Sequence, residues 1–277
     1  RALIDVVREI GDVVVVAPDG PQSGMGHAIT LNSTLRCDKI HIDDGPQIEY
    51  ECSGTPVDCI KLALSTILER KPDLCVSGIN QGPNLSVDVM HSGTVSAARE
   101  SGLYGLPSIA TSLSTYQHSD FADTAKATVE VIEAAVAVLP HVAENMLRPE
   151  GSSPEITGDD INDRILSEFK QGNLMLNINA PESWTNGFQT VSLGVRWYHN
   201  AIGLSNTESA GVAYGFKAAQ IEDEDIPNTD CNAVNSGAVA ITPLSCWPVN
   251  HPLGLSQELL EEATKQGENG LPIWLRN

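Results

Sequence analysis

The sequence predicts an α/β fold built on a doubly wound, mostly parallel sheet, with a β-rich extension at its C-terminal end. In the first half, short β-branched runs alternate with amphipathic stretches of helical length, as in parallel strands joined by helices. From residue 182 onward, short alternating runs dominate instead. With 41% apolar and 19% charged residues among 277, the composition is that of a globular chain able to bury a substantial core.

The elements of the first half follow in order. Apolar residues at helical spacing predict a helix within residues 2–10, and the run from Val13 to Ala17 predicts a buried strand. Thr55, Pro56 and Asp58 have the spacing of an N-cap, a first-turn proline and a capping box, so a helix is expected to begin there. The other predicted segments are extended stretches at 28–36, 39–42 and 47–52, strands at 74–77 and 107–113, and helices at 94–103 and 122–139.

The second half changes character after a polar, Pro- and Gly-rich stretch. We expect residues 1–181 to form a Rossmann-like core, with 140–172 variable. Residues 182–277 are expected to form a β-rich extension or swapped arm, from which 229–244 return to the core. The predicted segments are strands at 174–178, 191–197, 212–218 and 238–241, a solvated acidic loop at 222–225 and a helix at 257–266.

Charge excludes two classes of partner. The chain has 16 Lys+Arg against 36 Asp+Glu, a net charge of −20. Such a surface repels nucleic-acid backbones and anionic lipid, and no run approaches the roughly 18 apolar residues of a membrane-spanning helix. We therefore expect neither a nucleic-acid nor a membrane partner. A phosphate-bearing ligand would need a metal ion or a helix N-terminus to bind.

The six cysteines and one acidic pair have simple interpretations. The cysteines contain no Cys-x-x-Cys pair, which favours reduced, mostly buried thiols in a cytoplasmic protein over a disulfide or zinc framework. Asp43, Asp44 and Gly45 lie between two alternating runs, so they predict a hairpin turn rather than a metal site.

Well-known phosphate and catalytic motifs are missing from the sequence. It has no phosphate loop, no His-Glu-x-x-His and no nucleophile elbow. Gly24 and Gly26 open a dinucleotide-binding pattern, but Ile29 stands where the third glycine belongs. The missing third glycine argues against a dinucleotide enzyme.

Two polar loops follow predicted strands and are expected to lie at one edge of the sheet. Residues 22–27 follow the strand at 13–17, and residues 77–84 follow the strand at 74–77. Ser23, Asn80 and Asn84 bring neutral oxygens, which Mg²⁺ and Mn²⁺ accept alongside carboxylates. Taken singly, Ser23 and Asn80 also fit ordinary loop and turn positions.

A third loop enters the helix predicted at 94–103. Ser92 is either a simple N-cap or, with Gly93 and Thr94, part of an anion cradle made of free amides, hydroxyls and the positive helix end. The sequence leaves both interpretations open. His27 and His91 are candidates for proton transfer, although a single loop histidine usually has no such role.

These loops, with blocks along nearly the whole chain, resemble the SurE (survival-protein E) family. The match is poor at 140–172 and 184–227. The matching blocks are residues 14–19, 22–24, 27–30, 54–59, 72–80, 92–98, 176–181 and 229–244.

The resemblance implies a metal-dependent 5′-nucleotidase, a phosphatase that hydrolyses nucleoside 5′-monophosphates and in some members 3′-monophosphates or short polyphosphate. It also implies one Mg²⁺ or Mn²⁺ per subunit, and subunits joined into homodimers or homotetramers. Carried over residue by residue, Ser23 and Asn80 would be metal ligands. Ser92, Gly93 and Thr94 would contact phosphate, and we add Asn84 as a substrate-binding candidate.

The resemblance also implies an adjacent Asp pair and a first strand that would precede Arg1. Because Ser23 and Asn80 are neutral, we expect the chain as given to be weakly active or inactive, with its catalytic residues unknown. The alternative is a non-catalytic homologue or fragment that binds or oligomerises without the metal site.

Overall fold

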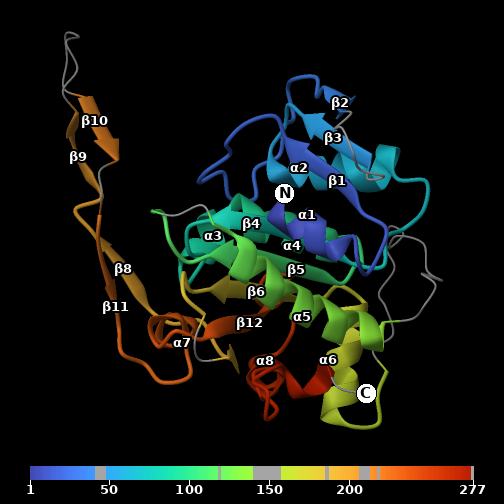
Figure 1. Ribbon diagram of the computed structural model, residues 1–277, viewed down its shortest axis with the longest axis vertical. Coiled ribbons are helices and arrows are strands. Elements are labelled where there is room, and N and C mark those ends of the chain that lie inside the picture. The colour runs from blue at the N-terminus through green and yellow to red at the C-terminus, as the bar shows by residue number, and fades with distance from the viewer. Residues whose placement is uncertain are drawn as a thin grey trace.

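The computed structural model describes residues 1–40, 48–117, 120–139, 157–184, 187–205, 213–216 and 219–275. Its central sheet has five strands in the order β4-β5-β6-β12-β7 (Figure 1). The parallel strands are β4 (Cys75–Gln81), β5 (Ser108–Leu113) and β6 (Leu174–Ala180). β12 (Val239–Ser245) runs antiparallel to β6 and parallel to β7 (Phe188–Thr190). The predicted α/β class with a mostly parallel sheet is confirmed.

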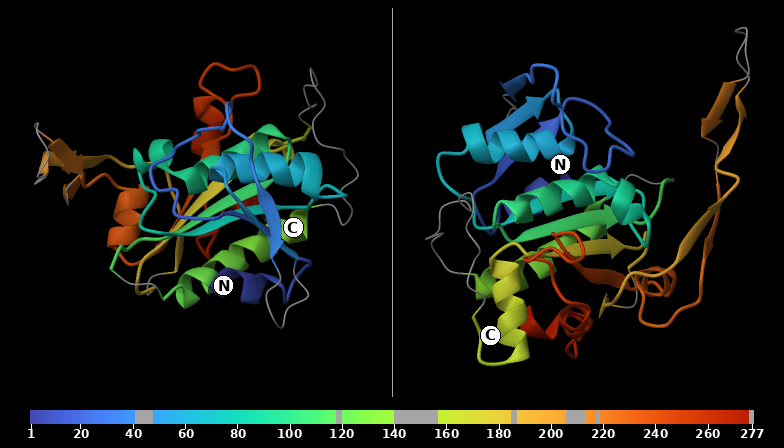
Figure 2. Two further views of the ribbon diagram at one scale, coloured as in Figure 1. Left: turned by 90° about the horizontal axis from the view of Figure 1, so that it is seen from above. Right: turned by 180° about the vertical axis from the view of Figure 1, so that it is seen from behind.

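Helices cover both faces of the central sheet (Figure 2), so every residue of β5 and β6 is buried. The face that presents Ala110 and Met175 is covered by α3 (Asp88–His91) and α4 (Gly93–Leu103), and α7 (Asp230–Asn235) packs beside them. The larger core lies on the other face. Its elements are α1 (Ala2–Val7), α5 (Ala122–Val138), α6 (Ile161–Lys170), α8 (Gln257–Ala263) and η2 (Ile273–Leu275).

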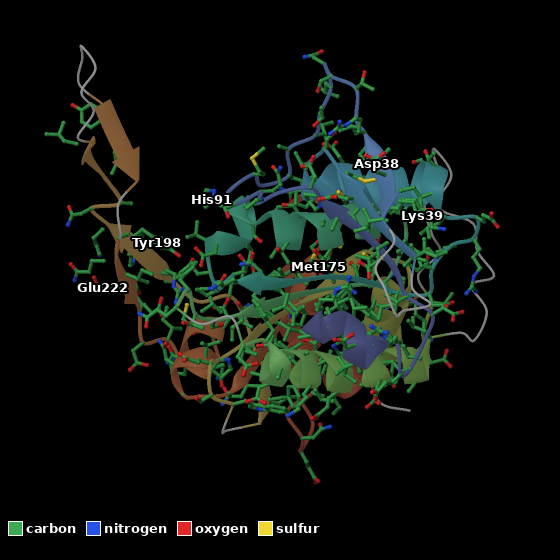
Figure 3. The ribbon with its side chains drawn as sticks, turned by 45° about the horizontal axis from the view of Figure 1, so that its top comes forward. Asp38, Lys39, His91, Met175, Tyr198 and Glu222 are labelled. Carbon is green, nitrogen blue, oxygen red and sulfur yellow. A yellow bond between two sulfur atoms is a disulfide. The ribbon has the colours of Figure 1, made fainter. Side chains whose placement is uncertain are left out.

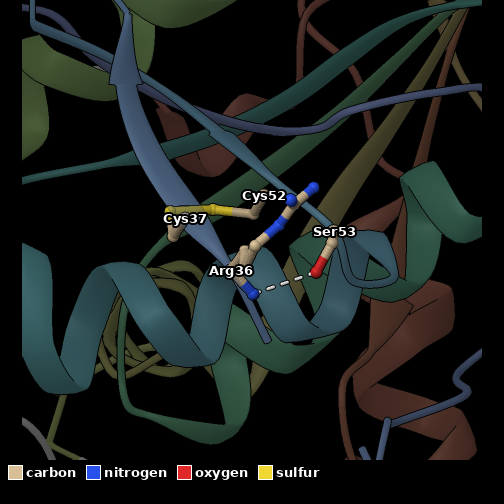
Figure 4. The surroundings of a disulfide bond; sticks show 4 residues. All are labelled: Arg36, Cys37, Cys52 and Ser53. Carbon is tan, nitrogen blue, oxygen red and sulfur yellow. Dashed lines mark hydrogen bonds between the residues drawn. A yellow bond between two sulfur atoms is a disulfide. The ribbon is translucent and has the colours of Figure 1, made fainter. Parts of the chain in front are cut away.

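A separate three-stranded sheet carries the first candidate loop. β1 (Val14–Pro18) pairs in parallel with β3 (Ile48–Cys52), which pairs antiparallel with β2 (Cys37–Ile40). This register sets Cys37 opposite Cys52 with their Cα atoms 4.1 Å apart, and a disulfide joins them (Figure 4). The expectation of reduced thiols is therefore wrong for this pair. Cys59, Cys75, Cys231 and Cys246 are not in disulfides, and all but Cys75 are buried.

The helix predicted at Thr55 is confirmed as α2 (Pro56–Leu62), which continues into a π-helical turn, η1 (Ala63–Ile67). The Thr55 hydroxyl accepts the Asp58 N–H at 3.1 Å, and the Asp58 carboxylate accepts the Thr55 N–H at 2.9 Å. The same carboxylate accepts the N–H and hydroxyl of Thr30 at 3.1 and 2.6 Å. Because a side chain provides these bonds, the strand predicted at 28–36 does not form. The predicted turn at residues 43–45 lies outside the described residues.

The second half of the chain projects a long two-stranded arm (Figure 1). At its base β8 (Arg196–His199) pairs with β11 (Gln220–Asp223), and further out β9 (Ile202–Ser205) pairs with β10 (Ala213–Phe216). Two predictions fail here. Residues 191–195, predicted to lie in a strand, do not form one. The acidic run, predicted to be a loop, begins within β11, where the Arg196 guanidinium binds the Asp223 carboxylate through two bonds of 2.7 and 2.9 Å.

After the arm the chain returns to the body through α7 and β12, and its last helices pack against the larger core. The division into 1–181 and 182–277 stays a prediction. Among the described residues, no helix combines the length and apolarity that crossing a bilayer would require.

Candidate active site

The start of α4 is the point at which the candidate loops meet. The Ser92 hydroxyl accepts the Val95 N–H at 3.1 Å, so the predicted N-cap is confirmed. Helix geometry leaves the amides of Gly93 and Thr94 without an acceptor inside α4. A Cβ atom at Gly93 would lie 2.9 Å from Pro56 Cγ, so only glycine fits here without displacing the neighbouring α2.

The Asn80 loop contacts this helix start directly. The Thr94 hydroxyl donates to Asn80 Oδ1 at 3.4 Å, and Asn80 Nδ2 donates to the Gly82 carbonyl at 2.9 Å. The register between β4 and β5 shifts between Ser77 and Asn80. Gly78 permits this bulge, because its φ is +132° and a Cβ atom would collide with the Thr111 carbonyl. The side-chain oxygen of Asn80 is thereby held against Thr94.

The Ser23 loop lies against the same segment from the other side. The Gly26 N–H donates to the His91 carbonyl at 2.9 Å. The Gln22 carbonyl lies 3.5 Å from the place that a Cβ atom of Gly93 would occupy. Ser23 itself is exposed. The prediction that the Ser23 and Asn80 loops lie at one edge of a single sheet is wrong, because β1 and β4 belong to different sheets. Direct contacts nevertheless bring the three loops together at one helix start.

Asn84 has different surroundings from the other candidates. It is buried, and its side-chain amide donates to the Ser112 hydroxyl at 2.7 Å. Its backbone N–H donates to Asn179 Oδ1 at 2.8 Å, and its carbonyl accepts from the amides of Asn177 and Asn179. These bonds join the loop after β4 to the interior of the sheet. Asn177 and Asn179 were not predicted to support the Asn84 loop, although both lie in a block that resembles the family.

Glu100 links the Ser23 loop to two helices. Its buried carboxylate accepts from His27 Nε2 at 2.7 Å and from Lys61 Nζ at 2.9 Å. Burial acts to raise the pKa of Glu100, but the bonds from His27 and Lys61 outweigh it and lower the pKa. The hydrogen bond to Glu100 also raises the pKa of Lys61. His27 is thus held by Glu100, a residue that was not predicted to belong to the site.

Asp88 is the first residue of α3, the helix that leads into the start of α4, and it connects this helix to the base of the arm. Its carboxylate accepts from the Tyr198 hydroxyl at 2.6 Å and from Arg196 Nη1 at 3.4 Å. Burial is the largest influence on Asp88 and raises its pKa in spite of these bonds. Because the partners are more than a hundred residues apart, no local pattern in the sequence marks them. His91, at the other end of α3, is exposed on the same side of the molecule as Tyr198 (Figure 3).

Beside a mostly parallel sheet, the structure gathers two strand-end loops with side-chain oxygens at a capped helix start. This combination defines a class: an α/β protein with a candidate anion site of the kind that holds phosphate esters. The family model described as Survival protein SurE matches residues 1–200, and the chain belongs to the SurE family. The resemblance found in the sequence is confirmed.

Individual relatives agree with this assignment. A protein named 5′-nucleotidase SurE from Flavobacterium johnsoniae is 54% identical over 161 residues, covering 57% of this chain and 62% of the relative. One of the same name from Heliobacterium modesticaldum is 34% identical over 257 residues, covering 91% and 83%. The crystal structure of the SurE protein from Aquifex aeolicus matches with a TM-score of 0.65 at 31% identity, covering 94% and 93% of the two chains.

The extent of these matches differs between relatives. The chain spans 62% of the length of the Flavobacterium johnsoniae relative and 48% of that of the Flavobacterium psychrophilum relative. These relatives are all named 5′-nucleotidase SurE.

Proposed function

We propose that the protein is a metal-dependent phosphatase that hydrolyses nucleoside 5′-monophosphates to nucleoside and phosphate. The observation that carries the proposal is the convergence of the Ser23 loop and the Asn80 side chain on the start of α4. The names of the relatives support the substrate class. Nucleoside 3′-monophosphates and short polyphosphate are further substrates in this proposal.

The phosphate would bind at the start of α4. The amides of Gly93 and Thr94 and the Thr94 hydroxyl supply donors there, and the helix dipole favours negative charge. The same donors would stabilise charge that gathers on the phosphoryl oxygens during hydrolysis. Ser92 holds this geometry by capping the helix, and Asn84 contributes by fixing the loop after β4 to the sheet.

The proposed Mg²⁺ or Mn²⁺ ion, one per subunit, would be held by Ser23 and Asn80. When bound, it would supply positive charge to the phosphoryl group. Both residues are neutral, and within the described residues no group of three or more His, Cys, Asp or Glu side chains could hold a metal ion. Ser23 and Asn80 alone therefore do not fit a divalent ion. We propose that the Asp pair, which the resemblance implies ahead of Arg1, supplies the negative charge that a divalent ion needs.

The arm would join subunits into homodimers or homotetramers. Ile202, Leu204 and Tyr214 on its outer strands are between 61% and 67% exposed, an unusual apolar surface for an unpaired arm. The cytoplasmic location stays a prediction. The Cys37–Cys52 disulfide removes part of its basis, because that prediction rested on reduced cysteines.

Phosphate release tests the proposal. Residues 1–277 alone, and the same residues preceded by the strand and Asp-Asp-Gly segment that the resemblance implies, would be assayed on nucleoside 5′-monophosphates with Mg²⁺ or Mn²⁺, with and without a chelator. We expect strong, chelator-sensitive activity only in the extended protein, and Asn80→Ala should lower it by at least about tenfold. Asn235→Ala, which changes a carboxamide at the base of the arm, is the control and should have no effect.

Two results would contradict the proposal in different ways. Equal activity of the two proteins would refute the role of the Asp pair. If neither protein released phosphate, the alternative of a non-catalytic binding or oligomerising homologue would be favoured.

A further inference from the structure

An exposed aromatic ring lies beside the Asn80 loop. Tyr116, which follows β5, is 61% exposed, and its ring rests on Gly82. A Cβ atom at Gly82 would collide with Cε1 of that ring, and the φ of Gly82 is +116°. The Gly82 carbonyl accepts from Asn80 Nδ2 at 2.9 Å. A single hydrogen-bonded turn therefore separates the ring from the side chain assigned to the metal and phosphate centre.

The Tyr116 side chain lies near Asp88 and Tyr198, the residues that join α3 to the base of the arm. The Tyr198 hydroxyl donates to Asp88 at 2.6 Å. Burial, with the nearby Asp88 carboxylate, raises the pKa of Tyr116. Asp88 begins α3, which leads into Ser92. Tyr116 thus contacts the turn that holds Asn80 and lies near Asp88, the first residue of the helix that leads to Ser92.

Two exposed methionines lie on the segments that meet next to the helix start. Met90 in α3 is 65% exposed, and Met25 in the Ser23 loop is 40% exposed. The backbones of these segments are joined by the bond from Gly26 to His91. A polar centre edged by exposed apolar and aromatic side chains suits a ligand with an ionic end and a flat, weakly polar end. A nucleoside monophosphate has this chemistry, whereas a sugar phosphate lacks the flat end.

We propose that Tyr116 is a nucleobase-binding residue, whose exposed ring stacks on the base while the phosphate lies at the start of α4. This inference rests on the proposed function. Aromatic rings are effective platforms for bases because every base has a π face. The packing of the ring on Gly82 restricts its orientation before the ligand arrives, which reduces the entropy lost on binding.

Two other exposed aromatic residues, Trp197 and Tyr214, do not have this placement. The Trp197 indole N–H on the arm donates to Glu224 at 2.8 Å. Tyr214, 67% exposed, lies on β10 in the outer part of the arm, away from β4 (Figure 1). Tyr214 therefore provides a matched control, a tyrosine of similar exposure without the neighbouring Asn80 loop.

Equilibrium binding tests the inference without depending on turnover. Adenosine 5′-monophosphate and ribose 5-phosphate, which differ by the base, would be titrated calorimetrically into the wild type, Tyr116→Ala, Tyr116→Phe and Tyr214→Ala. We expect the wild type to bind the nucleotide more tightly. Tyr116→Ala should weaken nucleotide binding by about tenfold, a typical loss for one stacked base, and leave ribose 5-phosphate unchanged. Tyr116→Phe keeps the ring and should stay within about threefold of the wild type, while Tyr214→Ala should match it.

Several outcomes would overturn the inference. Unchanged nucleotide affinity in Tyr116→Ala would do so, and so would an equal loss for both ligands, which would mean that the residue only shapes the loop. If Tyr116→Ala failed to fold, Tyr116→Leu would replace it, since leucine keeps apolar volume over Gly82 without an aromatic face. A wild type that bound both esters equally would contradict this inference alone. A wild type that bound neither would contradict the proposed function as well.

Discussion

The two sheets that carry the candidate site differ in how deeply their strands are buried. The central sheet has helices on both faces, and every residue of β5 and β6 is buried. The three-stranded sheet has largely half-buried or exposed strands, and a disulfide links two of them. The central sheet positions Asn80 and the start of α4, whereas Ser23 follows β1 of the smaller sheet.

This difference implies that one half of the site depends on core packing and the other on a few specific bonds. Asn84, Asn177 and Asn179 fix the loop after β4 to the buried sheet. The Ser23 loop is instead held by the Gly26–His91 bond and by His27 on Glu100. We therefore expect changes in the central sheet to cost global stability, and changes around Glu100 to move the Ser23 loop with a smaller effect.

The largest effect is expected from Ile178→Ala in β6. Ile178 is fully buried, so the substitution leaves a cavity and should lower the free energy of unfolding by about 3 kcal/mol. Ile48→Ala in β3 is the matched control, because Ile48 is 39% exposed and should cost under about 1 kcal/mol. Urea denaturation measures both. Similar losses in the two variants would remove the distinction between the sheets.

Breaking the disulfide is expected to act on the smaller sheet alone. Cys37 and Cys52 are 15 residues apart, and closing a loop of this length contributes about 3 kcal/mol at most in the chain-entropy model. The double variant Cys37→Ser, Cys52→Ser should speed amide hydrogen exchange in β2 and β3 and leave exchange in β5 and β6 slow. Faster exchange throughout the central sheet would show that the two sheets unfold as one unit.

The Glu100 carboxylate makes the stability of the folded protein depend on pH. The pKa of Glu100 in the folded protein lies below its ordinary value of 4.5, so the ionised form favours folding. This stabilisation is complete above the ordinary value and is lost as the pH falls through the lowered one. Glu100→Gln should therefore be less stable than the wild type by roughly 1 to 2 kcal/mol near pH 7. The difference should shrink as the pH falls below about 4.

Thermal unfolding across pH 3 to 7 would measure this difference, with Glu258→Gln on the exposed side of α8 as the control. A stability gap that stays constant down to pH 3 would contradict the ionised bond between Glu100 and its partners.

Local sequence patterns predicted the parts of the fold whose causes are local. The capping box at Thr55 and the long apolar periodicity of α5 both correspond to observed helices. The strand expected at 28–36 failed because the Asp58 carboxylate binds Thr30 from elsewhere in the chain. The prediction of a solvated loop at 222–225 failed for a similar reason, because Asp223 pairs with Arg196, 27 residues away.

The candidate site shows the same division. Strand-end loops and the cap at Ser92 were visible in the sequence, and Thr94 and Asn80 do meet. Their supports were not visible, because Glu100, Asp88 and Asn179 each act on residues distant along the chain. Which hydroxyls and amides touch a ligand depends on such three-dimensional contacts, so the assignments of Ser23 and Asn84 stay predictions.

The smallest effect is expected from Ser92→Ala. This variant distinguishes the two interpretations of Ser92, a simple N-cap or part of an anion cradle. Ser92 caps α4, and Ser256 caps α8 in the same way, accepting the Leu259 N–H at 3.2 Å. Each serine-to-alanine change should therefore cost about 1 kcal/mol of stability. Only Ser92→Ala should also weaken binding of inorganic phosphate, by a few-fold, because its cap lies at the proposed cradle. Calorimetric titration of both variants decides the point: equal phosphate affinity in the two would mean that Ser92 caps a helix and does nothing further for the ligand.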